Sequence, residues 1–118
     1  MLDHVGLRTT QFDHLMAFYK AVLAPLGYTV MMEYPGAAGL GRAYPDFWIG
    51  ADDKGSSNIH LAFKTDDRKA VDAFHAAALA HGGKDNGAPG LRDYTPTYYA
   101  AFVIDPDGNN LEVVCNDE

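Results

Sequence analysis

The sequence predicts an α+β fold in which one unit, a strand followed by a helix and three further strands, occurs twice. When His4 is set on His60, the segments DHVGLRT and NIHLAFKTD align. The correspondence continues without a gap through a helix-like stretch to Gly27 in the first copy and Gly83 in the second. Each of these stretches is followed by short strand-like segments. Self-similarity at a fixed offset indicates an internal duplication.

Composition limits the possible classes of protein. The 118 residues suit one domain, and a hydrophobic content of 47% is enough for a core. The net charge of −7, without a cluster of Lys and Arg, argues against nucleic-acid binding. The single Cys115 excludes an intrachain disulfide. We find no membrane-length apolar run and no targeting pattern, and we expect a cytoplasmic protein that contacts neither membrane nor nucleic acid.

The first unit is predicted to cover residues 1–51. Residues 2–9 alternate as a short strand, and Thr9 or Thr10 is expected to cap the next helix. Pro25 and Gly27 stand where that helix must end. Strands are expected at 28–34, 38–42 and 47–49. The helix is predicted from an apolar stripe at spacings of three and four, formed by Phe12, Leu15, Met16, Tyr19, Val22, Leu23 and Leu26.

A polar linker at 52–57 separates this unit from the second, at 58–118. The second unit begins with a strand at 59–64, and Asp66 or Asp67 is expected to cap its helix, which ends at Gly82-Gly83. Residues 84–97, rich in Gly and Pro, are predicted to form a long loop with a short strand at 85–88. Strands at 98–104 and 111–115 flank a DPDG turn.

Three side chains suggest a metal site. Glu112 stands inside the apolar segment LEVVC, where a carboxylate is costly unless it is paired or binds a metal. His4 and His60 occupy equivalent points of the two copies. Any one of them alone is more simply a partly buried polar residue. Together, two histidines and one carboxylate can form a three-ligand site with open coordination positions.

The chain resembles the vicinal oxygen chelate superfamily, which includes glyoxalases, bleomycin-resistance proteins and extradiol dioxygenases. The resemblance is carried by DHVGLRT, AFYKAVLAPLGY, HLAFKTDD and AFVIDPDGNNLEVV, and it covers nearly the whole chain. It implies two βαβββ modules forming a cupped, mixed eight-stranded sheet around a divalent metal. It further implies His4, His60 and Glu112 as ligands and a homodimer as the assembly. The ligand types do not separate Fe, Mn, Zn and Ni.

The fourth strand departs from the four-ligand pattern of glyoxalase I. Aligned on Glu112, the mirror position holds Trp48, which cannot bind a metal. Asp46 is nearby and points the same way as Trp48 only if the strand is regular there. A three-ligand set looks more like the extradiol dioxygenases or the fosfomycin-modifying transferases.

Other side chains are candidates for roles around the metal. Tyr98 or Tyr99 is a candidate catalytic acid, base or hydrogen-bond donor, although each can equally pack in the sheet. Trp48, Arg92 and Tyr94 are candidates for substrate binding, the last two in the long loop. A solvated arginine and a core tryptophan are the plainer alternatives.

We therefore expect a divalent-metal-dependent enzyme that acts on a small oxygen-chelating substrate. The reaction classes compatible with the resemblance are those of a lyase, an isomerase, a transferase and a ring-cleaving dioxygenase. The alternative is a metal-free protein that binds and sequesters a small molecule, as bleomycin-resistance proteins do.

Overall fold

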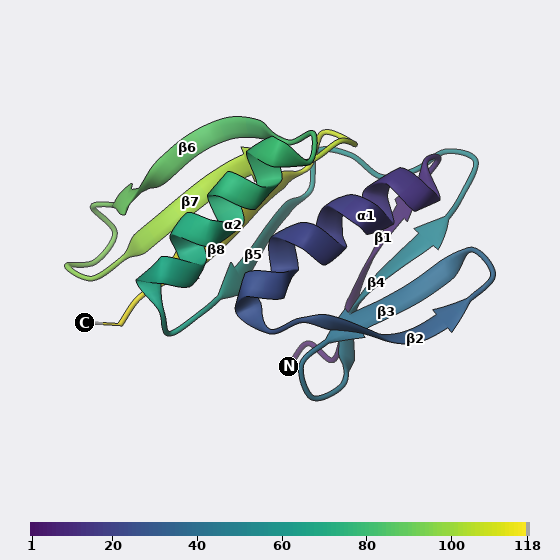
Figure 1. Ribbon diagram of the computed structural model, residues 1–118, viewed down its shortest axis with the longest axis horizontal. Coiled ribbons are helices and arrows are strands. Elements are labelled where there is room, and N and C mark those ends of the chain that lie inside the picture. Colours follow the sequence, from purple (N-terminus) through teal and green to yellow (C-terminus); the bar gives the residue numbers. More distant parts are fainter. Residues whose placement is uncertain (118) are drawn as a thin grey trace.

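The computed structural model describes residues 1–117 and confirms the predicted fold class: two copies of a strand–helix–three-strand module (Figure 1). The first module contains β1 (Val5–Thr9), α1 (Phe12–Leu23), a 3-10 turn η1 (Ala24–Leu26), β2 (Thr29–Tyr34), β3 (Ala37–Gly41) and β4 (Pro45–Ala51). The second contains β5 (His60–Lys64), α2 (Arg68–Ala80), β6 (Lys84–Leu91), β7 (Tyr99–Ile104) and β8 (Asn110–Cys115).

The strands form two four-stranded sheets, in the orders β1-β4-β3-β2 and β5-β8-β7-β6. In each sheet the first and last strands of the module are parallel neighbours and the other pairs are antiparallel. Within residues 1–117 no strand of one sheet pairs with a strand of the other, so the predicted eight strands form two four-stranded halves. The linker lies along the edge of β1, where Ser56 N–H donates to the Arg8 carbonyl and Arg8 N–H donates to the Ser56 hydroxyl.

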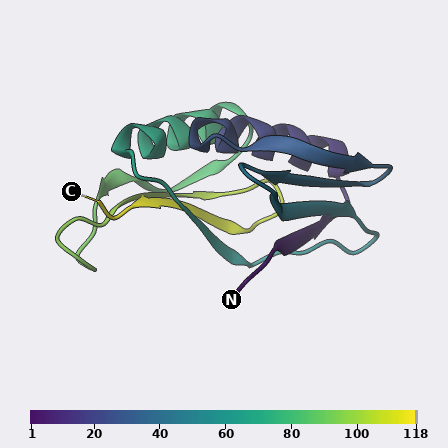
Figure 2. The same cartoon turned by 90° about the horizontal axis from the view of Figure 1, so that it is seen from below.

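Both helices cover the same side of the two sheets, as Figure 2 shows, and α1 packs beside α2. One hydrophobic core fills the space between helices and sheets and includes Leu15, Phe18, Phe47, Phe63 and Phe74. The opposite faces of both sheets carry no helix (Figure 2). We call them the first open face and the second open face. Because strand side chains alternate, each open face displays every second residue of its strands.

The registers of the two sheets confirm the alignment of the copies. Gly6 of β1 lies opposite Trp48 of β4, and Ala62 of β5 lies opposite Glu112 of β8. Since Gly6 and Ala62 are equivalent in the two copies, Trp48 and Glu112 occupy mirror positions, as the sequence predicts.

Several local predictions needed correction. β1 begins at Val5, so His4 precedes the strand. Neither Thr9 nor Thr10 caps α1: the N-cap is Gln11, and the Thr9 hydroxyl accepts from Gln11 N–H just outside the helix. In α2 the cap is Asp67, which accepts from the Lys69 N–H.

The predicted loop at 84–97 is mostly strand, because β6 extends to Leu91 through two register irregularities around Gly87 and Gly90. An edge strand tolerates Gly and Pro at such bulges. No helix in the described part of the chain is long and apolar enough to cross a membrane.

Candidate functional site

Glu112 is the most unusual side chain of the second open face, because it is a carboxylate only 3% exposed. Its neighbours along β8, Leu111 and Val113, point into the core, so the alternation of the strand turns Glu112 outward. Phe102 lies opposite it on β7 and Ala62 on β5. A buried carboxylate in this setting requires partners of its own.

Two side chains supply those partners. His60 Nε2 lies 3.1 Å from Oε1 of Glu112, and the Tyr98 hydroxyl donates to Oε2. The hydrogen bond to Glu112, followed by burial, raises the pKa of Tyr98 to about 12. At neutral pH the Tyr98 hydroxyl therefore keeps its hydrogen and donates it to the Glu112 carboxylate.

The orientation of His60 makes its contact with Glu112 chemically informative. Nδ1 of His60 lies 3.2 Å from the Asn110 carbonyl oxygen, which can only accept, so this contact favours the tautomer with the hydrogen on Nδ1. In the neutral imidazole with that tautomer, Nε2 presents a lone pair to a carboxylate oxygen 3.1 Å away, and a proton or a cation between the two atoms satisfies both. In the other tautomer Nε2–H donates to Glu112 directly. This pair is the chemical centre of the second open face.

Stacked groups fix the position of the His60 ring. Phe102 stacks on His60 at 6.3 Å between ring centroids and 19° between planes. The Arg92 guanidinium lies over the same Phe102 ring, with its Cζ 5.4 Å from the ring centroid. It also donates to the carbonyls of Ala88 and Gly90. In this structure Arg92 braces β6 and the ring beneath it, and its predicted contact with a substrate stays a prediction.

The third predicted ligand, His4, does not join this pair in the single chain. It is exposed, and its Nδ1 lies 2.8 Å from Asp3. It lines a hollow of about 370 Å³ on the first open face together with Gly6 and Trp48. Among residues 1–117 no three His, Cys, Asp or Glu side chains come together as a metal site. One chain therefore presents two of the three predicted ligands at one place and the third elsewhere.

Trp48 and Asp46 face different directions because β4 is irregular between them. Gly41 pairs with Pro45 and Leu40 with Phe47, which leaves Asp46 as the extra residue of a bulge. Its carboxylate accepts from the Tyr28 hydroxyl at 3.0 Å. Trp48 lies on the first open face, opposite Gly6 and Gly39. The side chain at the mirror of Glu112 is thus the indole.

The two tyrosines predicted as catalytic lie on opposite sides of the second sheet. The Tyr99 hydroxyl donates to Asp72 of α2 at 2.6 Å, and Arg68 lies over its ring at 5.0 Å. Tyr98 reaches Glu112 on the open side, with Tyr94 packed edge-on against it at 5.0 Å. Only Tyr98 contacts the His60–Glu112 pair.

Sequence reasoning missed three contributors to this site. Phe102 supports His60, the Asn110 carbonyl orients it, and Asn86 donates to the Asn110 side chain at 3.2 Å. Alternation along β7 from Ala100 was a signal for Phe102, since it places both on the face of Glu112. The backbone contact of Asn110 leaves no signal in a side-chain pattern.

Comparison with known proteins agrees with the fold. The family model of the Glyoxalase/Bleomycin resistance protein/Dioxygenase superfamily matches residues 1–113. No functionally curated protein sequence matches the chain.

Among solved structures, a glyoxalase/bleomycin resistance protein from Albidiferax ferrireducens is similar at 27% identity and a TM-score of 0.82, covering 96% of each chain. A glyoxalase I mutant from Zea mays is 27% identical with a TM-score of 0.70, over 96% of this chain and 45% of the maize chain. The bleomycin resistance determinant encoded on transposon Tn5 is 22% identical with a TM-score of 0.67, over 96% of this chain and 95% of the determinant.

Proposed function

The chain belongs to the Glyoxalase/Bleomycin resistance protein/Dioxygenase superfamily, and on that basis we propose that it is a divalent-metal-dependent enzyme acting on a small oxygen-bearing substrate. His60 and Glu112 are its principal metal ligands. The observation that carries the proposal is the meeting of two atoms that can both bind a metal, His60 Nε2 and Glu112 Oε1, 3.1 Å apart on the second open face. A cation bound to both would satisfy them.

The separation of the two ligand atoms fits a metal. Two donors each about 2.1 Å from one ion, at angles between octahedral and tetrahedral, lie roughly 3.0–3.4 Å apart. The His60–Glu112 distance of 3.1 Å falls in this range. The Asn110 carbonyl holds the tautomer that leaves Nε2 free to bind, which is the usual outer arrangement of a metal-binding histidine. Fe, Mn, Zn and Ni all accept such a ligand set.

His4 of a second copy of the chain is proposed as the third ligand. His4 precedes Gly6, the neighbour of Trp48, by two residues, as His60 precedes Ala62, the neighbour of Glu112. A symmetric dimer that packs the first open face of one copy on the second open face of its partner contains two such sites. Each site would combine His4 of one copy with His60 and Glu112 of the other.

The chain's own residues define the chemistry around the ion. A bound divalent ion polarises a substrate oxygen. Tyr98 keeps Glu112 in place and remains protonated at neutral pH, because its pKa is about 12. It therefore serves as the hydrogen-bond donor that orients Glu112 rather than as a base. Tyr94 packs on Tyr98 and borders the same site.

A metal-free binding protein is the second candidate function. It is favoured by one observation: a protonated His60 and the Tyr98 hydroxyl together satisfy both oxygens of Glu112 without any metal. In that case the open faces would bind a small molecule through Trp48 and Phe102 and carry out no reaction.

Metal content separates the two functions. Protein purified without a histidine tag and reconstituted with Fe, Mn, Zn or Ni should hold close to one ion per chain. Glu112→Gln keeps the side-chain volume but removes the charge, and should lower occupancy by tenfold or more. Glu33→Gln, at an exposed position of β2, is the matched control and should change nothing. Wild-type protein that stays empty with all four metals would reject the metal-dependent proposal.

Mixed dimers test the shared site. His4→Ala and Glu112→Gln each inactivate both sites of their own homodimers. A heterodimer of the two variants contains one site with both substitutions and one intact site, so the purified heterodimer should hold about half of the metal of the wild-type dimer. Mixing should restore nothing if all three ligands come from one chain.

A further inference from the structure

A hollow of about 590 Å³ begins beside Tyr98 and continues along the second open face. Its floor includes Val114 of β8 and Lys64 of β5, which lie opposite each other in the sheet. Arg42, from the connection between β3 and β4, closes it from the first module. Tyr98 lines the hollow and donates to Glu112, so this one side chain connects the hollow with the proposed metal site.

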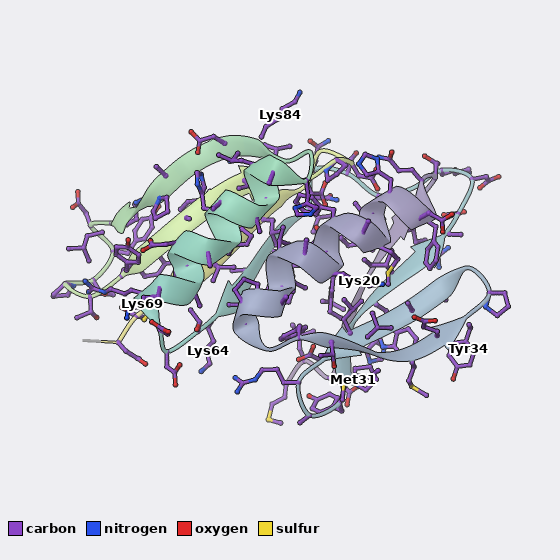
Figure 3. The ribbon with its side chains drawn as sticks, in the orientation of Figure 1. Lys20, Met31, Tyr34, Lys64, Lys69 and Lys84 are labelled. Carbon is purple, nitrogen blue, oxygen red and sulfur yellow. The ribbon has the colours of Figure 1, made fainter. Side chains whose placement is uncertain are left out.

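Two cations face this hollow without a carboxylate partner. Neither Arg42 nor Lys64 forms an ion pair within residues 1–117, in a chain where acidic residues outnumber basic ones by 16 to 9. Both also border an adjoining hollow of about 380 Å³. Figure 3 shows Lys64 pointing outward where the two modules meet, at the edge opposite Lys84. The two positive side chains therefore border the same pair of hollows.

The position of Arg42 is supported by packing. A Cβ at Gly27 would lie 3.4 Å from Arg42 Nε, so the arginine side chain runs across this glycine. Gly27 has a φ of 84°, in the left-handed region that glycine favours. The residue that ends η1 thus also leaves room for the arginine.

Acidic side chains also line the two hollows, and they restrict how a charged ligand can be oriented there. Asp66 and Asp117 line it, whereas Asp3 and Asp46 line the adjoining hollow. None of these carboxylates comes within ion-pair distance of Arg42 or Lys64 in the described residues. A ligand must present an anionic end to Arg42 and Lys64 and keep negative charge away from Asp66 and Asp117.

We infer that the substrate of this site carries an oxyanion, a carboxylate or a phosphate, which Arg42 and Lys64 bind. The inference rests on the proposed function for the position of the reacting oxygen at Glu112. Lys64 lies two residues beyond Ala62, the neighbour of Glu112, or roughly 7 Å along the strand. Guanidinium and ammonium donors are the usual protein partners of such groups.

Inorganic phosphate and acetate, titrated in parallel into metal-free protein and followed by amide chemical shifts, test this inference without metal or substrate. Both anions should shift the amides of Thr65 and Asn116, which line the hollow, and the tighter of the two identifies the group. Lys64→Gln and Arg42→Gln should each weaken binding roughly two- to fivefold, and the double variant about tenfold. Lys84→Gln, an exposed lysine on β6, is the control and should bind as the wild type does. Shifts that are absent, or equal in the double variant and the wild type, overturn the inference.

Two further variants decide which hollow holds the anion. Asp66 lines only the larger hollow and Asp3 only the adjoining one. Asp66→Asn should tighten phosphate binding, whereas Asp3→Asn should leave it unchanged. The reverse pattern rejects the larger hollow as the site. Since EDTA-treated protein is used throughout, failure of anion binding is distinguishable from failure of metal binding, which only the elemental analysis measures.

Discussion

The two open faces share one backbone arrangement and carry opposite chemistry. On the first, the Trp48 indole lies flat against the sheet: a Cβ at Gly39 would come 2.8 Å from its ring, and its Nε1 donates to the Pro45 carbonyl at 3.0 Å. Tyr34 stacks on it at 6.4 Å. On the second, the mirror residue Glu112 is held by His60 and Tyr98. The duplication thus supplied two equivalent surfaces, one of which became aromatic and the other ionisable.

The helices of the two copies diverge in a similar way. Tyr19 of α1 and His75 of α2 are equivalent in the sequence alignment. Tyr19 donates across to Asp105, in the turn between β7 and β8 of the other module, at 2.5 Å. His75 stays within its own module and contacts Asp85 on β6 at 2.9 Å. The buried link between modules is made from the first helix.

The largest expected effect concerns this link. Asp105→Ala removes an acceptor that is only 3% exposed and that also binds the backbone N–H groups of Asp107 and Asn109. Leaving these donors and the Tyr19 hydroxyl buried without a partner should lower the free energy of unfolding by about 3–5 kcal/mol. Tyr19→Phe, which deletes only the hydroxyl, should cost about 1.5–3 kcal/mol. Urea unfolding monitored by circular dichroism provides the measurement.

Asp93→Ala, at an exposed position, is the control for the Asp105 variant and should change stability by less than about 0.5 kcal/mol. If Asp105→Ala were no more destabilising than this control, the turn would not depend on the link between the modules.

The next prediction concerns a substitution that makes the first open face resemble the second. Trp48→Glu places a carboxylate at the mirror of Glu112. In the proposed dimer it offers a fourth protein ligand, which should tighten Zn or Ni binding by roughly tenfold or more, the scale on which outer partners of metal sites act. Competition with a chelator measures the change. Trp48→Gln, of equal size to the glutamate, controls for loss of the indole, and both variants must first be shown to fold. Equal metal affinity in the two variants would mean that the first open face does not approach the metal.

The sequence was sufficient for the fold and for the register because both follow from periodicity. The equivalence of Gly6 with Ala62 already implied that Trp48 mirrors Glu112, and the strand pairing confirms it. Local geometry was less predictable. The bulge that turns Asp46 toward Tyr28 depends on how Gly41 and Pro45 pair, and residue types do not specify that.

The candidate site was predictable only in part. Placing His60 and Glu112 on one face required only alternation along two strands. Relating His4 to them required knowing how two half-sheets are arranged, and the sequence was interpreted as one closed cup. The proposed roles of Arg42 and Lys64 could not be predicted from the sequence, because these residues belong to different modules and line one hollow only in the folded chain.

The ionisable character of the second open face can be measured directly at Tyr98. Its hydrogen bond to Glu112, then burial and the charge of Glu112, raise its pKa from 10.0 to about 12. Glu112→Gln should return the pKa most of the way toward 10.0. The ultraviolet absorbance of phenolate, taken as the difference between each protein and its Tyr98→Phe partner, isolates this group. Glu33→Gln should leave the pKa of Tyr98 near 12.

The sign of the linked stability follows from that shift. A pKa raised in the folded state means that folding favours the protonated phenol, so the stabilisation is complete below pH 10.0 and is lost as pH rises toward 12. Tyr98→Phe should therefore reduce the dependence of stability on pH in this alkaline window. An unchanged alkaline slope would mean that Tyr98 does not donate to Glu112 in solution.

The smallest expected effect is at the counterpart of the buried link, the contact between His75 and Asp85. The hydrogen bond from His75, and then that from Gly87 N–H, lower the pKa of Asp85 below 3.8. A lowered carboxyl pKa gives a stabilisation that is present above pH 3.8 and is lost as pH falls through the folded-state pKa. Because Asp85 is exposed, solvent screens the contact and Asp85→Asn should shift the urea midpoint only slightly at neutral pH. Its difference from wild type should disappear in acid, whereas Asp93→Asn should show no difference at either pH. The contrary result would be that Asp85→Asn lowers the free energy of unfolding at neutral pH as much as Tyr19→Phe does. That result would show that the contacts of the two helices contribute equally to stability, and that the two copies differ only at their open faces.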